Sequence, residues 1–222
     1  MHHPFEVSPL EFPQGEKHIS LNGPAGMLEA ITCSVEAPIG VGIVCHPHPL
    51  QEGTMNNKVV HIVSRAFNNK GLATIRFNYR GVGKSQGSFG DSIGEVEDLL
   101  AVIEWANLVM PNTKIWLAGF SFGAYIAALA ATKYPCAQLF SVAPAVHHQP
   151  YDKLPALECP WVVIQGQQDE VVVPEDVYTW FEKQKAKMQF PMSLLKLDAS
   201  HFFHGKLVPL RALVEENFVA HL

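Results

Sequence analysis

Two segments of the chain place a serine between two glycines in the pattern G-x-S-x-G: GFSFG at 119–123 and GKSQG at 83–87. Such a serine becomes a nucleophile when it lies on a sharp turn that a strand enters and a helix leaves. The apolar run KIWLAGF leads into Ser121, and an alanine-rich helical pattern leaves it. We therefore expect Ser121 to be a nucleophile, and the alternative role for this serine is an ordinary helix N-cap.

The second pattern lies in a glycine-rich stretch several residues after its strand, and no helix begins at Ser85. We interpret this stretch as a turn-rich loop. Its GKS resembles the end of a phosphate-binding loop, but the first glycine of that pattern would fall at Asn78, inside a strand. Lys84 is therefore expected to be a solvated loop cation.

A serine hydroxyl needs a histidine to take its proton, and the histidine needs a carboxylate to hold its tautomer. Asp169 follows the apolar run WVVIQGQ, and His201 follows the run MSLLKLD. Because the carboxyl ends of parallel strands meet at one edge of a sheet, both residues should lie near Ser121. Rival groups remain for each role: Glu170, Asp176 and Asp198 for the acid, and His204 for the base.

The oxyanion of an acyl-transfer intermediate needs two N–H donors, one of them from the residue after the nucleophile, here Phe122. The second donor should come from HPHPL at 46–50, where Pro47 and Pro49 have no N–H to give. His48 is favoured, with Leu50 as the alternative.

The elements that must position these groups follow from the alternation of short apolar runs with helical periodicity, which predicts an α/β fold. Strands are expected at 18–21, 28–35, 40–46, 72–79, 114–120, 138–143, 161–167 and 192–198. Helices are expected at 56–70, 95–107, 122–133 and 175–187 and from about residue 206. The first two strands flank a turn-rich linker and predict an antiparallel hairpin at the sheet edge. One domain is expected over 1–222, with 1–17 as an irregular N-terminal arm.

Composition argues for an ordinary globular protein: 222 residues, 48% of them hydrophobic, with a net charge of −5 and no run of like charges. This balance argues against nucleic acid or an anionic membrane as a partner. The four cysteines are widely spaced in apolar stretches, which predicts reduced core thiols. With no signal-like start and no apolar run long enough to span a membrane, the sequence predicts a cytoplasmic protein. Nothing in it indicates the oligomeric state.

Six motifs can be compared with known families: HPHPL at 46–50, GTMNNKVV at 53–60, FNYRGVGKSQG at 77–87, GFSFG, QDEVV and SHFFHG. Through these motifs, residues 18–220 resemble the α/β-hydrolase superfamily, and most closely a subgroup of small predicted serine hydrolases without a cap domain. The resemblance implies a mostly parallel sheet of about eight strands with helices on both faces. It also implies serine esterase chemistry on a carboxylic ester or thioester, which requires no metal or organic cofactor.

The interval 144–160 is too short for a helical cap domain, so an open site is expected. Small or partly extended esters, or an ester on a larger carrier, should fit such a site. Four side chains are candidates to line its acyl side, and the alternative for each is the commoner role of a core residue: Leu50, Phe120, Phe122 and Phe202.

Three other interpretations stay open. A metallohydrolase is suggested only by paired histidines, His46/His48, His147/His148 and His201/His204, without an H-E-x-x-H motif. A peptidase would use the same triad as an esterase. A catalytically inactive binding protein on the same fold is the remaining alternative, because a fold does not dictate a function.

Overall fold

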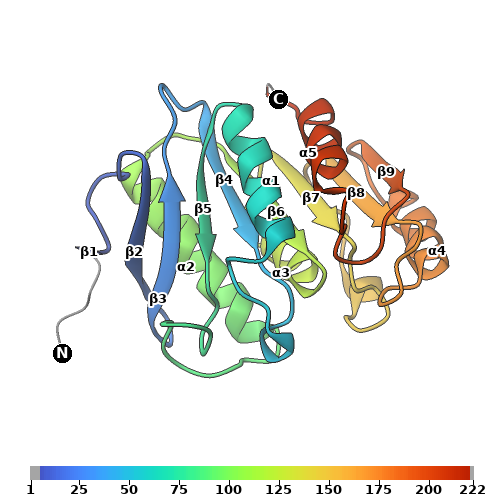
Figure 1. Cartoon of the computed structure of the whole chain (residues 1–222), viewed down its shortest axis with the longest axis horizontal. Coiled ribbons are helices and arrows are strands. Elements are labelled where there is room, and N and C mark those ends of the chain that lie inside the picture. The colour runs from blue at the N-terminus through green and yellow to red at the C-terminus, as the bar shows by residue number, and fades with distance from the viewer. Residues whose placement is uncertain (1–5, 221–222) are drawn as a thin grey trace.

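The computed structural model describes residues 6–220, which form one mixed sheet covered by helices on both faces (Figure 1). The strands are β1 (Glu6–Val7), β2 (Glu16–Gly23), β3 (Gly26–Cys33), β4 (Gly40–Cys45), β5 (Leu72–Phe77), β6 (Ile115–Phe120), β7 (Gln138–Val142), β8 (Trp161–Gly166) and β9 (Met192–Leu197). Their order across the sheet is β1-β2-β3-β5-β4-β6-β7-β8-β9. From β5 through β4 to β9 every neighbouring pair is parallel. The predicted α/β fold with a mostly parallel sheet is confirmed.

The helices divide between the two faces (Figure 1). They are α1 (Lys58–Asn69), α2 (Ile93–Val109), α3 (Phe122–Ala131), α4 (Pro174–Lys185) and α5 (Leu207–Glu216). Helices α1 and α5 share one apolar cluster with the sheet, and α2, α3 and α4 share the other. Each predicted helix is present, and its ends lie within a few residues of the predicted ones.

Strand β6 shows why the sheet separates these two clusters. Ile115 and Leu117 belong to the cluster under α2 to α4, whereas Trp116, Ala118 and Phe120 belong to the cluster under α1 and α5. Successive strand residues point to opposite faces, so a fully apolar strand is buried from both sides. The serine after Phe120 therefore emerges from the centre of the fold.

Residues 6–17 of the predicted N-terminal arm are more ordered than expected, and residues 1–5 lie outside the described part of the chain. Strand β2 begins at Glu16 rather than 18, and the two-residue β1 pairs with it in parallel. Between these strands, the Trp105 indole donates a hydrogen bond to the Pro9 carbonyl at 2.9 Å, and Phe12 packs against the same indole. The arm is thus fixed across α2. The predicted hairpin is confirmed, with β2 and β3 joined by Pro24 and Ala25.

The connection from β7 to β8, residues 143–160, contains only one short helical turn, a 3₁₀ turn at Tyr151–Lys153. Tyr151, Leu154 and Leu157 bury their side chains beneath it. This connection therefore folds back onto the domain and forms no cap. Within residues 6–220, no helix has the length and apolar character needed to cross a membrane.

Candidate active site

Ser121 occupies the turn between β6 and α3 in a strained backbone conformation, with φ 55° and ψ −115°. A positive φ is costly for a residue with a side chain and persists only where the surrounding structure enforces it. Ser121 stands at the N-cap position, but its side chain makes no capping hydrogen bond. The ordinary N-cap role is therefore wrong, and the hydroxyl is not tied to the first turn of α3.

The two glycines of GFSFG allow the strand and helix to meet this closely. A Cβ on Gly119 would overlap the backbone of Gly123, and a Cβ on Gly123 would overlap the backbone of Cys45 and His46. Any larger residue at either position would push α3 away from the sheet. The spacing of the motif is thus a packing requirement of the turn that presents Ser121.

Asp169 and His201 come together after β8 and β9. The distance between His201 Nδ1 and Asp169 Oδ2 is 2.9 Å, and both side chains are buried. Asp169 Oδ1 accepts the backbone N–H groups of Val171 and Val172 at 2.9 and 2.7 Å, and Gln165 donates its amide to Oδ2 at 3.0 Å. Burial would raise the pKa of Asp169, but the bonds from His201, Val172 and Val171 outweigh it and lower the pKa below its ordinary value. Asp169 is held as a carboxylate.

The His201 imidazole lies beside the serine turn. Its ring centroid is 5.0 Å from that of Phe120, the residue directly before Ser121. With Nδ1 bonded to Asp169, the ring nitrogen left for a proton transfer is Nε2.

The rival acids are not bonded to the His201 ring, and the rival base is not bonded to Asp169. Glu170 accepts the backbone N–H of His201 at 3.2 Å and does not contact its ring. Asp198 is paired with Lys206 on the surface, and Asp176 lies in the first turn of α4. His204 is exposed and packs against Phe202. The structure therefore joins the side chains of Asp169 and His201 and joins none of the rival side chains to either of them.

The loop after β4 carries the two backbone N–H groups that are candidate oxyanion donors, those of His48 and Leu50. The Leu50 N–H donates to Nδ1 of His48 at 3.2 Å, within the 3₁₀ turn Pro49–Gln51. The His48 ring packs against Phe122 at 4.8 Å and Phe89 at 5.3 Å between centroids. His48 is therefore held against the first residue of α3, and the Leu50 N–H is engaged by its ring.

His46 ties the carboxyl ends of β4 and β5 together. Its Nε2 accepts the Tyr79 N–H at 3.2 Å, and its Nδ1 donates to the Pro47 carbonyl at 2.7 Å. Complete burial lowers the pKa of His46 to about 3, so the ring is neutral at neutral pH. Both ring nitrogens are used, and this histidine has no lone pair left for a metal.

Ser85, the serine of the second motif, has a structural role. Its hydroxyl donates to the Asn78 carbonyl at 2.7 Å and accepts the Glu29 N–H at 2.9 Å. No helix begins there, and Lys84 is exposed, so the prediction of a turn-rich loop is confirmed.

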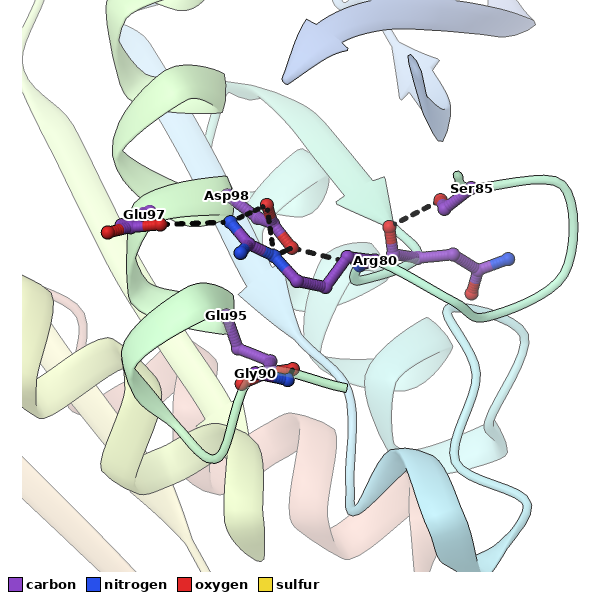
Figure 2. A network of polar contacts seen from close by, with 7 residues as sticks. Arg80, Ser85, Gly90, Glu95, Glu97 and Asp98 are labelled. Carbon is purple, nitrogen blue, oxygen red and sulfur yellow. Dashed lines mark hydrogen bonds and ion pairs between the residues drawn. The ribbon is translucent and has the colours of Figure 1, made fainter. Parts of the chain in front are cut away.

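The same loop is anchored to α2 by charges (Figure 2). The Arg80 guanidinium binds Asp98 at 2.8 to 3.1 Å, and the Arg80 N–H donates to the same carboxylate at 2.9 Å. Glu95, also fully buried, accepts the Gly90 N–H at 2.8 Å. Since Phe89 precedes Gly90, these bonds fix the ring that packs against His48.

The expected acyl-side residues divide into two pairs. Phe120 and Phe122 are only 1% and 2% exposed, so the expectation that they line an open site is wrong; both are core residues of the sheet and α3. Leu50 and Phe202 are 70% and 41% exposed. Phe202 also lines a cavity of about 260 Å³ with His204 and the start of α1.

The paired histidines do not form a metal centre. Across the described part of the chain, no group of three or more His, Cys, Asp or Glu side chains is arranged to hold a metal ion. The rings of His147 and His148 make a tilted contact in the connection after β7, with their centroids 4.0 Å apart.

Sequence reasoning missed Gln165 and Phe89. Gln165 is completely buried near the carboxyl end of an otherwise apolar strand, and its amide orients Asp169. An isolated buried polar residue in such a strand was the available signal. Phe89 lies among glycines and polar residues, where nothing in the local pattern indicates a contact with His48.

Comparisons with known proteins show which family and which solved structures the chain resembles. Residues 53–157 match the family model described as serine aminopeptidase, S33. An α/β serine hydrolase homologue from Coxiella burnetii superposes with a TM-score of 0.89 at 43% identity, covering 94% of this chain and 100% of that one. A member of the α/β serine hydrolases without a lid, from Xanthomonas campestris, has a TM-score of 0.85 at 38% identity, covering 93% of this chain and 94% of the other.

A curated relative, an uncharacterised protein of Rickettsia prowazekii, is 37% identical over 202 residues, which span 85% of this chain and 82% of the relative. The chain belongs to the α/β serine hydrolases. The similar structure from Xanthomonas and the short β7–β8 connection agree that this hydrolase fold has no lid.

Proposed function

We propose that the protein is a serine hydrolase that cleaves carboxylic esters through Ser121, His201 and Asp169. The observation that carries the proposal is the 2.9 Å bond between Asp169 and His201 at the sheet edge where Ser121 occupies a strained turn. A carboxylate, an imidazole and a serine in this relation perform acyl transfer on several unrelated folds.

In the first half-reaction, His201 Nε2 takes the proton of the Ser121 hydroxyl as the oxygen attacks the ester carbonyl. Asp169 holds the ring through Nδ1 and stabilises the imidazolium that forms. Its low pKa keeps it ionised for this purpose. The imidazolium then gives its proton to the departing alcohol or thiol, and the acyl group stays on Ser121.

The tetrahedral oxyanion is held by the N–H groups of Phe122 and His48 in this proposal. Phe122 is the first residue of α3, where backbone N–H groups have no helical acceptor. His48 is favoured over Leu50 because the Leu50 N–H already donates to the His48 ring. Loss of one such donor slows acyl transfer by about 10²- to 10³-fold.

In the second half-reaction, His201 removes a proton from water, which attacks the acyl-enzyme and releases the acid. Every step uses groups of this chain, so the proposed reaction requires no metal or organic cofactor. With no lid over the site, the exposed Leu50 and Phe202 are the proposed apolar contacts for the acyl or alcohol group. This suits small or extended esters, or an ester or thioester on a larger carrier.

Peptidase activity is the second candidate, because the matched family model is described as a serine aminopeptidase. The same triad would attack an amide, with His201 donating its proton to the leaving amine. The two activities are separated by turnover of p-nitrophenyl esters of increasing acyl length against aminoacyl p-nitroanilides. Ester turnover at least about 100-fold faster per mole of enzyme supports the esterase, and the reverse supports the peptidase.

The primary experiment is labelling of the purified protein with a fluorophosphonate, with the modified residue mapped by mass spectrometry. Labelling is expected on Ser121, to be lost in Ser121→Ala and retained in Ser85→Ala. Absence of labelling in a folded sample would contradict the proposal and favour an inactive binding protein.

A further inference from the structure

Two cysteines that are distant in sequence lie in contact at the edge of the sheet opposite Ser121. The sulfurs of Cys136 and Cys159 are 3.4 Å apart. Cys136 lies just before β7 and Cys159 just before β8, so both stand at the amino ends of parallel neighbours. Their side chains are 8% and 3% exposed.

The two sulfurs are in non-bonded contact and need only a short approach to form a covalent bond. A disulfide has a sulfur–sulfur distance of about 2.05 Å, so the two sulfurs must approach by about 1.4 Å. Neither cysteine lies within a helix or a strand. The segment before β7 and the segment before β8 can therefore move the two sulfurs together without breaking the hydrogen bonds between β7 and β8.

A cavity of about 430 Å³ gives access to these thiols. It is lined by the segment 131–136 after α3, by residues of the segment 155–159 before β8, and by both cysteines. One water molecule occupies about 30 Å³ in the liquid, so hydrogen peroxide fits easily in this space.

The other two cysteines differ from this pair. Cys45 is fully buried in the central strand β4, where burial raises its pKa to about 12. Cys33 is half-buried at the end of β3, with its sulfur 3.8 Å from the Ser34 carbonyl.

We propose that Cys136 and Cys159 are an oxidation site that closes to an intramolecular disulfide when the protein meets hydrogen peroxide. One thiolate attacks a peroxide oxygen and becomes a sulfenic acid, releasing hydroxide, which takes up a proton to form water. The second thiolate attacks that sulfur and expels a second hydroxide, which also becomes water. Together the two thiols lose two electrons and two protons, and one peroxide becomes two waters.

Oxidation should become faster as the pH rises. The contact with Cys159 and burial raise the pKa of Cys136, so its thiol is largely protonated at neutral pH. The thiolate is the reacting form. This inference does not depend on the proposed esterase activity, because the cysteines lie away from Ser121.

Trypsin offers a direct test, because Lys153 lies between the two cysteines. Cleavage after Lys133, Lys153 and Lys183 puts Cys136 in peptide 134–153 and Cys159 in peptide 154–183. The full chain is treated with peroxide, unfolded with N-ethylmaleimide to block free thiols, and digested without reductant. We expect the two peptides to be recovered joined, at a mass two hydrogens below their sum, and to separate after reduction.

Two variants complete the test. Cys136→Ser should abolish the joined peptide, whereas Cys33→Ser should leave it unchanged. In the unmutated protein, bond formation should raise the melting temperature by on the order of 5 °C, because the bond restrains the unfolded chain. Recovery of the two peptides separately from folded, peroxide-treated protein, either unmodified or as sulfinic acids, would overturn the proposal. So would bonds that join Cys33 residues of two chains instead.

Discussion

Asp169 binds the His201 ring through one carboxylate oxygen and the backbone of its own loop through the other. The Oδ2–Nδ1 distance is 2.9 Å, and Oδ1 accepts the Val171 and Val172 N–H groups. A carboxylate held at both oxygens cannot rotate away from the ring. The loop after β8 therefore sets the orientation of the histidine after β9.

Replacing this carboxylate should impair catalysis while leaving the fold intact. In Asp169→Asn the side-chain oxygen can still accept the two backbone N–H groups, which turns the amide nitrogen towards His201 Nδ1. The ring must then take the wrong tautomer, and we expect kcat for ester hydrolysis to fall by about 10⁴-fold. Steady-state kinetics with a p-nitrophenyl ester measure the loss.

The matched control for Asp169→Asn is a substitution of the neighbouring acid, Glu170. Glu170 accepts only the His201 backbone N–H, so Glu170→Gln should change kcat by less than about tenfold. Equal losses in the two variants would assign the effect to the loop and not to the Asp169 carboxylate.

The proposed oxyanion donor can be removed with one substitution. His48 has φ −54°, which proline can adopt, so His48→Pro deletes the N–H at a compatible backbone angle. His48→Ala removes the ring and keeps the N–H. We expect kcat/KM of the proline variant to be about 10²- to 10³-fold below that of the alanine variant. Indistinguishable rates in two equally folded variants would rule out the His48 N–H as a donor.

Stability should fall on mild acidification because of His46. Its pKa is lowered from an ordinary value of about 6.5 to about 3 in the folded protein. The unfolded chain therefore binds the extra proton first, and the stabilising effect is complete above about pH 6.5 and lost progressively towards pH 3. The free energy of unfolding should be about 2 kcal/mol lower at pH 5 than at pH 8 from this group alone.

Urea unfolding at pH 8, 7, 6 and 5 tests this dependence. His46→Gln should be less stable at pH 8, because it loses two buried hydrogen bonds, but its stability should depend less on pH. The exposed His204→Gln serves as the control and should keep the slope of the original chain. An unchanged slope in His46→Gln would contradict the assignment.

The attachment of the loop 78–92 to α2 should depend on Asp98 and much less on its neighbour Glu97. Arg80 contacts both Glu97, whose side chain is 51% exposed, and Asp98, whose side chain is fully buried. Asp98→Asn should reduce the free energy of unfolding by about 2 to 4 kcal/mol, because the largely buried guanidinium loses its buried charged partner and keeps only the half-exposed Glu97. Glu97→Gln should cost less than about 1 kcal/mol. Similar midpoints for the two variants in urea would show that the network is not held by Asp98.

Much of the fold could be predicted because the apolar pattern within each helix and strand matches the geometry of that element. Strand β6 is a continuous apolar run, and α1 places its apolar residues on one face, so periodicity identified both. The order of elements then placed Ser121, Asp169 and His201 at one sheet edge. The arm at 8–15 could not be predicted, because its order depends on Trp105, about 90 residues away.

The site was less predictable where a side chain has two possible environments. Phe120 and Phe122 flank the nucleophile in sequence, but strand and helix geometry turn both rings into the core. The sequence favours His48 over Leu50 as an oxyanion donor but does not show that the Leu50 N–H donates to the His48 ring. The environment of such a side chain depends on contacts between separate parts of the chain, which the local sequence pattern does not predict.

Strand β9 and the histidine that follows it come late in the chain, and β9 pairs only with β8. Ser121 leaves the ribosome well before His201 does. While the chain is being made, the serine can occupy its turn but has no base to take its proton. In the proposed mechanism, acyl transfer therefore cannot begin until the last strand has joined the sheet and brought His201 to Ser121.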